Sequence, residues 1–471
     1  QLRYISYEII INMKMHIPWI ISRRRFFFAI FIDYLLTNFF YFFEFSKKFD
    51  GNPNLIVTSS ISFFWIILSY ILGRYMICRK INKMEISKTI LKAFFVFASC
   101  NFIYLVINWS NKLFLLFFTN RNISINFQNE QNIFFIKTTL FLAIFSCIVQ
   151  FSLSIITNKI YSNKKLWLFY GSLEVYKDFK KEIGFKNGFN IKRIRDNCDI
   201  KKLNFEELEG IILDNKKEIN KLDLDQIFFF KSKGIKVLNV LKWFENELHR
   251  IPPFFIVTKY QVIEKFNLLD DSYKIRIKRI GDFTFSLFLL LITSPLFVLI
   301  PLFIYLEDGA PIFYSQIRTG FKGEKITIYK FRSMIKNAEQ FGPQWSKSED
   351  KRITKVGKII RALRIDELPQ LLSVIEGKMS MIGPRPERPE IEKNLLNEIP
   401  FYEYRNILKP GISGWAQVNC NYAASKEDTI KKLSYDIYYI NHISFLLDLL
   451  ILIKTIKIIF NSNSHKPKQL D

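Results

Sequence analysis

The chain has 471 residues, of which 49% are hydrophobic, and a formal net charge of +25. This length predicts about three domains, and an apolar content that includes 49 Phe exceeds the needs of one soluble core. The basic residues flank apolar segments and do not form one patterned face, so we expect anionic lipid as a partner and no nucleic acid. The five cysteines and four histidines have no ligand spacing, which argues against a disulfide framework or a zinc site.

Four apolar segments occupy the first third of the chain, at residues 26–45, 55–72, 90–109 and 133–156. Their lengths predict a four-helix transmembrane bundle over residues 1–160, and the first helix is expected to be retained because no small-residue cleavage site follows it. The loop from Arg74 to Lys92 is rich in basic residues, whereas the stretch before the fourth segment has only Arg121. Both ends of the bundle are therefore expected on the cytoplasmic side of the membrane. Asp33, inside the first segment, marks either a functional site or a helix contact.

Residues 161–262 are predicted to form a small Rossmann-like α/β domain. Three short apolar runs, at 166–170, 210–213 and 235–240, alternate with amphipathic stretches, as buried parallel strands do. The turn after the first run holds a single glycine, Gly171, where a phosphate-cradling G-x-G-x-x-G needs three. We therefore expect a degenerate, non-catalytic domain with a regulatory, scaffolding or dimerising role, and a segment 1–260 that is dispensable for chemistry.

The remaining residues, 271–471, are expected to form a catalytic domain on the membrane surface. Their first apolar run, 283–306, is broken by Ser294 and Pro295 and has basic residues on both flanks. Both flanks should then lie on one side of the membrane, which predicts a re-entrant helix bent at the proline. The tail 444–460 is amphipathic and suits the membrane interface. The fold class expected for the whole chain is α/β with membrane helices.

Two adjacent carboxylates, Asp366 and Glu367, stand just before Pro369 and an apolar run at helical spacing. They are expected at a helix N-terminus, where acidic residues commonly meet the positive end of the helix dipole. Carboxylates there can also act as a nucleophile or hold a divalent cation, and nearby Arg361 and Arg364 can hold phosphate oxygens. The stiff turn Gly383-Pro384-Arg385-Pro386 favours this second interpretation, because it fixes one arginine between two prolines.

Several blocks, in this order, make residues 278–460 resemble a known family. They are KRIGD, Ser294-Pro295, YKFRSM, DELPQLLSV, MSMIGPRPE, KPGISGWAQVN and YDIYYINHISFLLDL. The chain resembles the bacterial sugar transferases, the monotopic polyprenyl-phosphate phosphoglycosyl transferases, in their long form with a four-helix bundle and a Rossmann-like domain. The resemblance implies a phosphotransferase that moves a hexose 1-phosphate from a UDP-sugar to a polyprenyl phosphate such as undecaprenyl phosphate. It releases UMP and starts exopolysaccharide, capsule or O-antigen assembly, as undecaprenyl-phosphate glucose and galactose phosphotransferases do.

The resemblance also implies roles for single residues. Asp366 would be the nucleophile that forms an aspartyl phosphosugar, and Glu367 with Asp366 would hold Mg²⁺. Basic residues would face the phosphates of the nucleotide sugar: Arg385, Arg364, Arg361, Lys330, Arg332 and Arg318. Residues of the bent helix would lie at the lipid phosphate and the interface: Lys278, Arg279, Asp282, Ser294 and Pro295. Asp448 matches a further acidic position near the family's active site.

One departure from the family pattern limits how far the resemblance extends. Glycine and arginine usually follow Asn419 in the family, whereas this chain has Cys420 and Asn421, so the identity of the transferred sugar is left open. Whether the protein forms a homodimer is also left open. Trp415 is expected to offer a flat surface for a base or sugar. Two other functions are weighed: an inactive membrane sensor or scaffold of the same fold, which the intact Asp366-Glu367 pair and Arg385 oppose, and a glycosyltransferase that attacks the sugar carbon and releases UDP.

Overall fold

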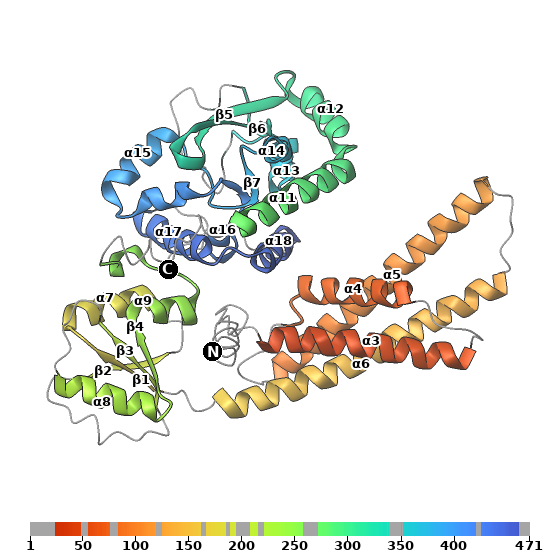
Figure 1. Ribbon diagram of the computed structural model, residues 1–471. Helices are drawn as coiled ribbons and strands as arrows, with labels where there is room; N and C mark the ends of the chain where they lie inside the picture. The colour runs from red at the N-terminus through yellow and green to blue at the C-terminus, as the bar shows by residue number, and fades with distance from the viewer. Residues whose placement is uncertain are drawn as a thin grey trace, which may run out of the picture. The chain divides into compact units, whose positions relative to one another are not determined.

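The computed structural model describes residues 24–48, 55–75, 83–118, 125–161, 166–184, 189–194, 208–214, 221–257, 272–336, 338, 350, 352–420 and 425–460. Figure 1 shows the order of the helices and strands along the chain. The chain divides into two compact units, Gln1–Leu166 with Asn204–Leu208, and Trp167–Leu203 with Glu209–Asp471. Each unit is described by itself below.

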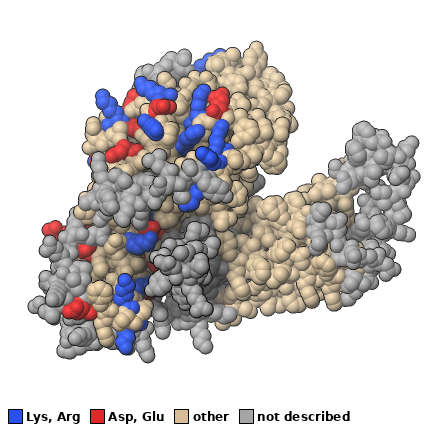
Figure 2. All heavy atoms as spheres, viewed as in Figure 1, with Lys and Arg blue, Asp and Glu red and all other residues tan. Residues whose placement is uncertain are grey.

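The first unit consists of helices, and all four predicted apolar segments are helical. They lie in α3 (Arg24–Lys48), α4 (Leu55–Ile71), α5 (Lys83–Phe118) and α6 (Ile125–Tyr161). Among the described residues, three stretches are long and apolar enough to cross a membrane, Phe27–Phe45, Thr89–Trp109 and Asn132–Leu153, and α4 adds a shorter apolar helix. Helix α3 packs against α4 and α6, and α5 packs against the same two helices. Their outer faces expose large apolar side chains such as Phe39 and Phe102, and the face in Figure 2 is nearly free of charged side chains.

Asp33 makes the contacts of a helix-linking residue. Its Oδ2 accepts hydrogen bonds from Tyr75 Oη at 2.7 Å and Trp65 Nε1 at 3.2 Å, and its Oδ1 accepts one from Ser146 Oγ. Arg74 Nη1 lies 3.8 Å from Asp33 Oδ2, with both side chains buried. Arg74 lies in the turn after α4, as the predicted loop has it, and is a buried partner of Asp33. Arg79, Lys80 and Arg121 lie outside the described residues.

The second unit begins with the predicted parallel sheet, whose strand order is β2-β1-β3-β4. The three predicted strands are confirmed as β1 (Leu166–Tyr170), β3 (Leu208–Leu213) and β4 (Lys236–Asn239), with β3 and β4 parallel. Strand β2 (Asn190–Arg193) was not predicted, because its four residues NIKR contain one apolar side chain and no apolar run. Helices α7 (Leu173–Ile183) and α8 (Lys221–Ser232) follow β1 and β3.

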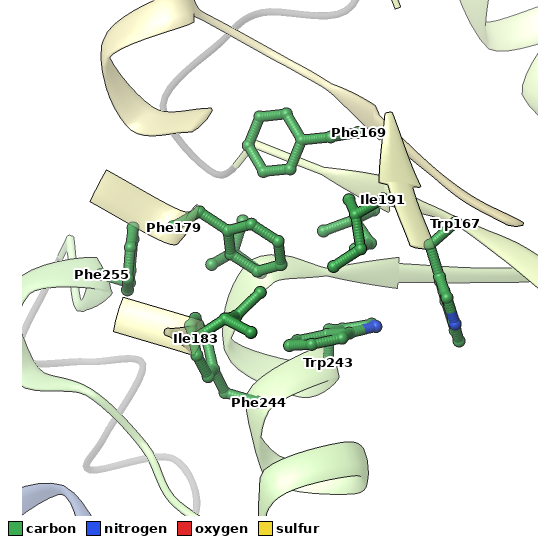
Figure 3. Packing of buried hydrophobic residues seen from close by; sticks show 10 residues of the cluster. Trp167, Phe169, Phe179, Ile183, Ile191, Trp243, Phe244 and Phe255 are labelled. Carbon is green, nitrogen blue, oxygen red and sulfur yellow. The ribbon is translucent and has the colours of Figure 1, made fainter. Parts of the chain in front are cut away.

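The core of this α/β domain is aromatic and extends past the last strand. Trp167 and Phe169 of β1 and Phe179 of α7 pack with Trp243, Phe244 and Phe255 (Figure 3). The last three come from α9 (Val240–Trp243), the π-helical turn η4 (Phe244–Leu248) and the 3-10 turn η5 (Pro253–Phe255). Residues 240–256 therefore belong to the fold of the α/β domain.

The turn after β1 is closed by an acidic side chain. Ser172 caps α7 and its backbone N–H donates to Asp214 Oδ2 at 3.2 Å, while Asp214 N–H donates to Tyr170 O at 2.9 Å. A Cβ added to Gly171 would lie 2.4 Å from Asp214 Cβ. The carboxylate thus lies at the start of α7, where a dinucleotide-binding domain holds phosphate, and the loss of cofactor binding stays a prediction.

The catalytic region opens with a bent helix pair. Helices α11 (Ser272–Thr293) and α12 (Leu296–Asp308) meet at Ser294-Pro295, and the apolar stretches Lys274–Thr293 and Leu296–Asp308 are bent by 57°. Ser294 Oγ donates to Leu291 O at 2.8 Å, which satisfies a carbonyl near the bend as expected. The hairpin β5 (Phe313–Thr319) and β6 (Lys325–Phe331) follows, joined by η6 (Phe321–Gly323).

The rest of the catalytic region is mostly helical. Its elements are α13 (Lys355–Ala362), η7 (Ile365–Glu367), α14 (Gln370–Glu376), β7 (Ser380–Ile382), α15 (Pro389–Glu398), η8 (Tyr402–Ile407), β8 (Gly411–Ser413), α16 (Trp415–Asn419), α17 (Lys426–Asn441) and α18 (Phe445–Phe460). Strands β7 and β8 pair in parallel. The turn η7, which carries Glu367, contacts β6 of the hairpin, and η8 contacts α17. Figure 2 shows charged side chains gathered on one face of the molecule.

Candidate active site

The Asp366-Glu367 pair lies in a 3-10 turn of its own. Arg364, with φ 57°, starts η7, and Pro369 stands before α14, which Gly377 ends at φ 86°. The pair was expected at a helix N-terminus, and the structure places it in the turn directly before α14. The turn buries both carboxylates: Asp366 is 9% exposed and Glu367 6%.

Glu367 is surrounded by three of the predicted basic residues. Its Oε1 accepts from Lys330 Nζ of β6 and from Arg385 Nη2, both at 2.8 Å, and its Oε2 accepts from Arg364 Nη1 at 3.3 Å. Burial raises the pKa of Glu367, but the charges of Arg385, Lys330 and Arg364 outweigh it and hold the pKa well below the ordinary value. Glu367 is therefore an anion that gathers cations from three segments.

Asp366 has the opposite electrostatic character. Burial, followed by the negative charge of Glu367, raises the pKa of Asp366 to about 6, against the opposing charges of Lys330, Arg361 and Arg385. A carboxylate that titrates near neutral pH is more basic than an ordinary aspartate and still ionised at pH 7. Two neighbours in the sequence thus have different chemistry, which is the pattern expected of paired acids with separate roles.

Arg385 is fixed through its backbone carbonyl by residues that were not predicted from the sequence. Arg405 Nη2 donates to Arg385 O at 2.7 Å, and the same nitrogen lies 3.3 Å from Asp436 Oδ2 on α17. Both charged side chains are buried. Their signal in the sequence is the single acid in the apolar run YDIYYI, because a charge in such a run needs a buried partner.

Backbone hydrogen bonds beside the paired strands β7 and β8 fix the other side of the loop that carries Arg385. Gly383 N–H donates to Ser413 O and Gly411 N–H donates to Pro384 O, each at 2.9 Å. A Cβ added to Gly383 would lie 2.4 Å from Lys409 O, so glycine is required where the two loops meet. The stiff turn that carries Arg385 is therefore fixed through backbone contacts.

The remaining basic candidates lie at three places. Arg361 acts on the pKa of Asp366 through its charge. Arg318 Nη1 donates to Pro386 O at 3.2 Å, beside the Arg385 turn. Arg332 donates from Nη2 to Gly309 O at 2.6 Å and pairs with Asp308 at 3.1 Å, so it holds the connection between α12 and β5. The structure gives Arg332 this anchoring contact, and its contact with phosphate stays a prediction.

The predicted interface residues form a second cluster. Lys278 Nζ lies 2.8 Å from Asp448 Oδ2, and Tyr439 Oη donates to Asp448 Oδ1 at 2.6 Å. Asp282 accepts from Ser380 Oγ at 2.7 Å and from Met381 N–H at 3.0 Å. These bonds join α11 to α17, α18 and β7. The contacts of Asp448 are thus with Lys278 and Tyr439, and its role beside the nucleophile stays a prediction.

Arg279 belongs to the same helix and reaches the end of α14. It donates to Val374 O at 2.5 Å and to Ile375 O at 2.7 Å, satisfying carbonyls of the last helical turn. The bent helix is therefore tied directly to the helix that follows the acidic pair. Contact of Arg279 with lipid phosphate remains a prediction.

Trp415 cannot serve as an open stacking surface, and the expectation for this residue was wrong. Its side chain is 1% exposed. The Tyr438 ring stacks on it at 6.0 Å between centroids, and Lys454 Nζ lies 4.4 Å from its ring centroid. The indole is a buried packing residue between α16, α17 and α18.

The acidic pair can supply only part of a metal site. No group of three or more His, Cys, Asp or Glu residues suited to a metal occurs in the described part of the chain. Mg²⁺ commonly takes one or two carboxylates and completes its shell with substrate phosphates and water. Asp366 and Glu367 fit that partial donor set, and a diphosphate could replace Glu367 as the partner of the three cations.

Comparison with known proteins places this site in a family. The sequence profile of the bacterial sugar transferases matches residues 273–462. UDP-N-acetylgalactosamine-undecaprenyl-phosphate N-acetylgalactosaminephosphotransferase of Aeromonas hydrophila is 48% identical over 183 residues, 39% of this chain and 43% of that protein. The uncharacterized sugar transferase EpsL of Bacillus subtilis is 40% identical over 185 residues, 38% of this chain and 86% of EpsL. Undecaprenyl-phosphate glucose phosphotransferase of Komagataeibacter xylinus is 36% identical over 217 residues, 45% and 40% of the two chains.

The chain belongs to the bacterial sugar transferase family. The match covers most of EpsL but less than half of the Aeromonas and Komagataeibacter proteins. The similarity lies in the part of the chain that carries Asp366, Glu367 and Arg385, so the expected family assignment is confirmed for the catalytic region.

Proposed function

We propose that this protein transfers a sugar 1-phosphate from a UDP-sugar to a membrane polyprenyl phosphate and releases UMP. The observation that carries the proposal is the acidic pair, in which Asp366 has a pKa near 6 while Glu367 is held as an anion by Lys330, Arg364 and Arg385. A basic carboxylate beside clustered cations suits nucleophilic attack on a phosphate. Relatives named as undecaprenyl-phosphate phosphotransferases support the same chemistry.

The reaction proceeds in two displacements at one phosphorus atom. An Asp366 oxygen attacks the phosphorus that carries the sugar, the bond from that phosphorus to the bridging oxygen breaks, and UMP leaves with that oxygen. An oxygen of the polyprenyl phosphate then attacks the same phosphorus, and Asp366 leaves as a free carboxylate. The product is a polyprenyl diphosphate sugar. The covalent intermediate divides one difficult displacement between anions into two easier steps.

The basic residues stabilise charge in both displacements. Arg385, Lys330 and Arg364 surround the acidic pair and would exchange Glu367 for phosphate oxygens when the diphosphate binds. Mg²⁺, when bound by Asp366 and Glu367, would neutralise part of the diphosphate charge. Arg405 keeps Arg385 in place by bonding to its carbonyl oxygen.

The membrane arrangement follows from where the two substrates must meet. The proposal places α3 to α6 as a four-helix transmembrane bundle in the bacterial inner membrane, and α11 with α12 as a re-entrant helix. The 57° bend and the strong exposure of Leu291, Val298 and Leu306, between 66% and 71%, support this. Nucleotide sugar from the cytoplasm and lipid phosphate would then reach Asp366 on one face.

The sugar and the pathway are proposed by analogy with the relatives. A hexose or N-acetylhexosamine fits the activities for which the Aeromonas and Komagataeibacter proteins are named. The names ExoY, an exopolysaccharide production protein, and EpsL favour exopolysaccharide assembly over capsule or lipopolysaccharide. We propose that the transfer is the first step of such an assembly.

One experiment separates this function from the two alternatives. Membranes containing the protein are incubated with single UDP-sugars and undecaprenyl phosphate, and the released nucleotide is identified. UMP release that requires Asp366 supports the proposal, and hydroxylamine should cleave the acyl phosphate intermediate. Release of UDP would indicate a glycosyltransferase, and no release with any sugar would favour an inactive scaffold.

The topology is tested independently. Reporter tags after Asp471 and within residues 340–350 should both be cytoplasmic if α11 and α12 form a re-entrant helix. Pro295→Ala removes a helix-breaking ring worth about 3 kcal/mol, so a straight spanning helix becomes more favourable and activity should fall. A tag found outside the cytoplasm in the unmutated protein would contradict the re-entrant arrangement.

A further inference from the structure

We propose that the Rossmann-like domain positions Arg385 of the transferase site. The domain holds helix α17, and α17 in turn fixes Arg385. This inference rests on the proposed function. Its physical basis is a docking segment, residues 244–256, that belongs to the core of the α/β domain on one side and bonds to α16 and α17 on the other.

Three contacts join the docking segment to the catalytic helices. Trp415 Nε1 donates to His249 O at 3.0 Å. Ile251 N–H donates to Ser434 O at 2.8 Å. Glu245 Oε1 lies 2.9 Å from His442 Nε2 and also accepts from Lys242 Nζ at 3.0 Å.

These contacts are buried, which makes them costly to lose. Glu245 is 2% exposed, Ser434 is fully buried and Trp415 is 1% exposed. A buried polar group needs a hydrogen-bond partner, and removing one member of a pair leaves the other buried without a partner. The contacts therefore restrain α16 and α17 much more firmly than an exposed ion pair would.

The backbone of the docking segment is strained where it meets Trp415. His249 has φ 53° and ends the π-helical turn η4. Non-glycine residues seldom adopt this conformation, and π-helical turns occur often at functional sites. Here the unusual geometry directs a carbonyl oxygen to the indole nitrogen, which is a specific docking contact.

Helix α17 carries the restraint to the active site. Ser434, Tyr438 and His442 repeat every four residues and share the face that meets the docking segment, where the His249 ring also contacts Tyr438. Asp436 lies two residues after Ser434, on the other side of the helix, and pairs with Arg405. Arg405 bonds to Arg385 O. The domain thus acts on Arg385 through one helix with two functional faces.

This inference changes the expectation that residues 1–260 are dispensable. A chain that begins at Asp271 would keep Asp366 and its basic neighbours but lose the partners of Trp415, Ser434 and His442. The full chain is therefore the proper material for the test. The variant is Glu245→Ala, and the matched control is Glu209→Ala, which removes a half-exposed carboxylate paired with Lys236 in the same domain.

Two readouts in the purified full-length protein test the proposal. Glu245→Ala should lower kcat/KM for UMP release about tenfold, the size of effect known for residues along such networks, while Glu209→Ala leaves it unchanged. Hydrogen exchange should rise in α17 and also in residues 383–388 around Arg385. In an Arg385→Lys background, Glu245→Ala should cost about twofold or less, because the shared partner is already altered.

The opposite results would overturn the proposal. These are activity of Glu245→Ala equal to that of the control, faster exchange confined to α17, or a full tenfold loss in the Arg385→Lys background. If Glu245→Ala does not accumulate, Trp415→Phe replaces it, since it removes the donor to His249 O but keeps the ring packing. If the unmutated protein releases no UMP, the proposed function fails, and the exchange of residues 383–388 still decides whether the domain positions the Arg385 turn.

Discussion

The turn after β1 and the turn before α14 each have buried carboxylates beside a helix start, but the partners of those carboxylates differ. In the first, Asp214 accepts from the Ser172 backbone N–H and fills the helix N-terminus. In the second, Glu367 is bonded to Lys330, Arg364 and Arg385, and Arg361 adds a fourth positive charge near Asp366. In the first turn, the carboxylate bonds to a backbone N–H that could otherwise bind phosphate, so the site is closed. In the second turn, two carboxylates lie among four cations, so positive charge remains for a diphosphate.

The largest effect is expected when the nucleophile of the second turn is removed. Asp366→Asn keeps the shape of the side chain, but an amide cannot form the acyl phosphate. UMP release should fall by at least about 10³-fold, as it does when a nucleophile is lost. The control is Asp225→Asn, an exposed aspartate of α8. Substantial UMP release by Asp366→Asn would show that another residue is the nucleophile.

A smaller loss is expected when the partner of the cations is neutralised. Glu367→Gln leaves Lys330 and Arg385 beside a neutral amide and weakens the proposed Mg²⁺ contact, so UMP release should fall about 10²-fold. The Mg²⁺ concentration for half-maximal rate should also rise. Glu376→Gln, at the half-exposed end of α14, is the matched control. An unchanged response to Mg²⁺ would contradict the metal role of Glu367.

The pH dependence should report the unusual pKa of Asp366. The reactive form is the carboxylate, so the rate should be full above pH 7 and fall as pH drops through about 6, to roughly a tenth at pH 5. Single-turnover UMP release without lipid acceptor is the required measurement, because the phosphate of the acceptor itself titrates near pH 6. A rate that stays nearly constant down to pH 5 and falls only near pH 4 would indicate an ordinary aspartate.

The smallest effect is expected at the turn after β1, where Asp214 bonds to the Ser172 backbone N–H. Asp214→Ala removes the bond to Ser172 N–H and should reduce the free energy of unfolding by about 1 kcal/mol, with UMP release within about twofold of the unmutated protein. Isothermal titration with AMP should still show no binding, since Gly171 alone does not make a phosphate loop. Binding of AMP by the variant would mean that Asp214 alone closes the site.

Local patterns pointed to the acidic pair, Arg361, Arg364 and Arg385, whereas Lys330, Arg332 and Arg318 came from the resemblance to a known family. The local signals, a helix start at Pro369 and the stiff turn at Arg385, each lie within a few residues of the group they position. They also predicted the three apolar strands and the bend at Pro295, which the structure confirms.

Contacts between distant segments could not be predicted in this way. Arg405 with Asp436, Glu245 with His442 and Asp214 with Ser172 each join residues that are far apart in the chain. A single sequence can show that a charge such as Asp436 needs a buried partner, but it does not show which residue that partner is. Trp415 shows the converse error, because a flat ring beside two glycines looks available until its neighbours are placed. Burial of polar side chains was thus the main information that the structure added.

The contacts of Asp33 have a consequence for how the protein is made. In the proposed transmembrane bundle α3 is synthesised before α4 and α6, so Asp33 would enter the membrane before Trp65, Tyr75 and Ser146 have been made. An aspartate at the centre of a lone helix disfavours insertion by about 3 kcal/mol. We therefore expect α3 alone to insert poorly, and to insert efficiently when α4 to α6 follow it, which glycosylation tags in a translocation assay would measure. Asp33 would then make the biogenesis of the helices cooperative, so that a chain truncated before α6 is retained poorly in the membrane.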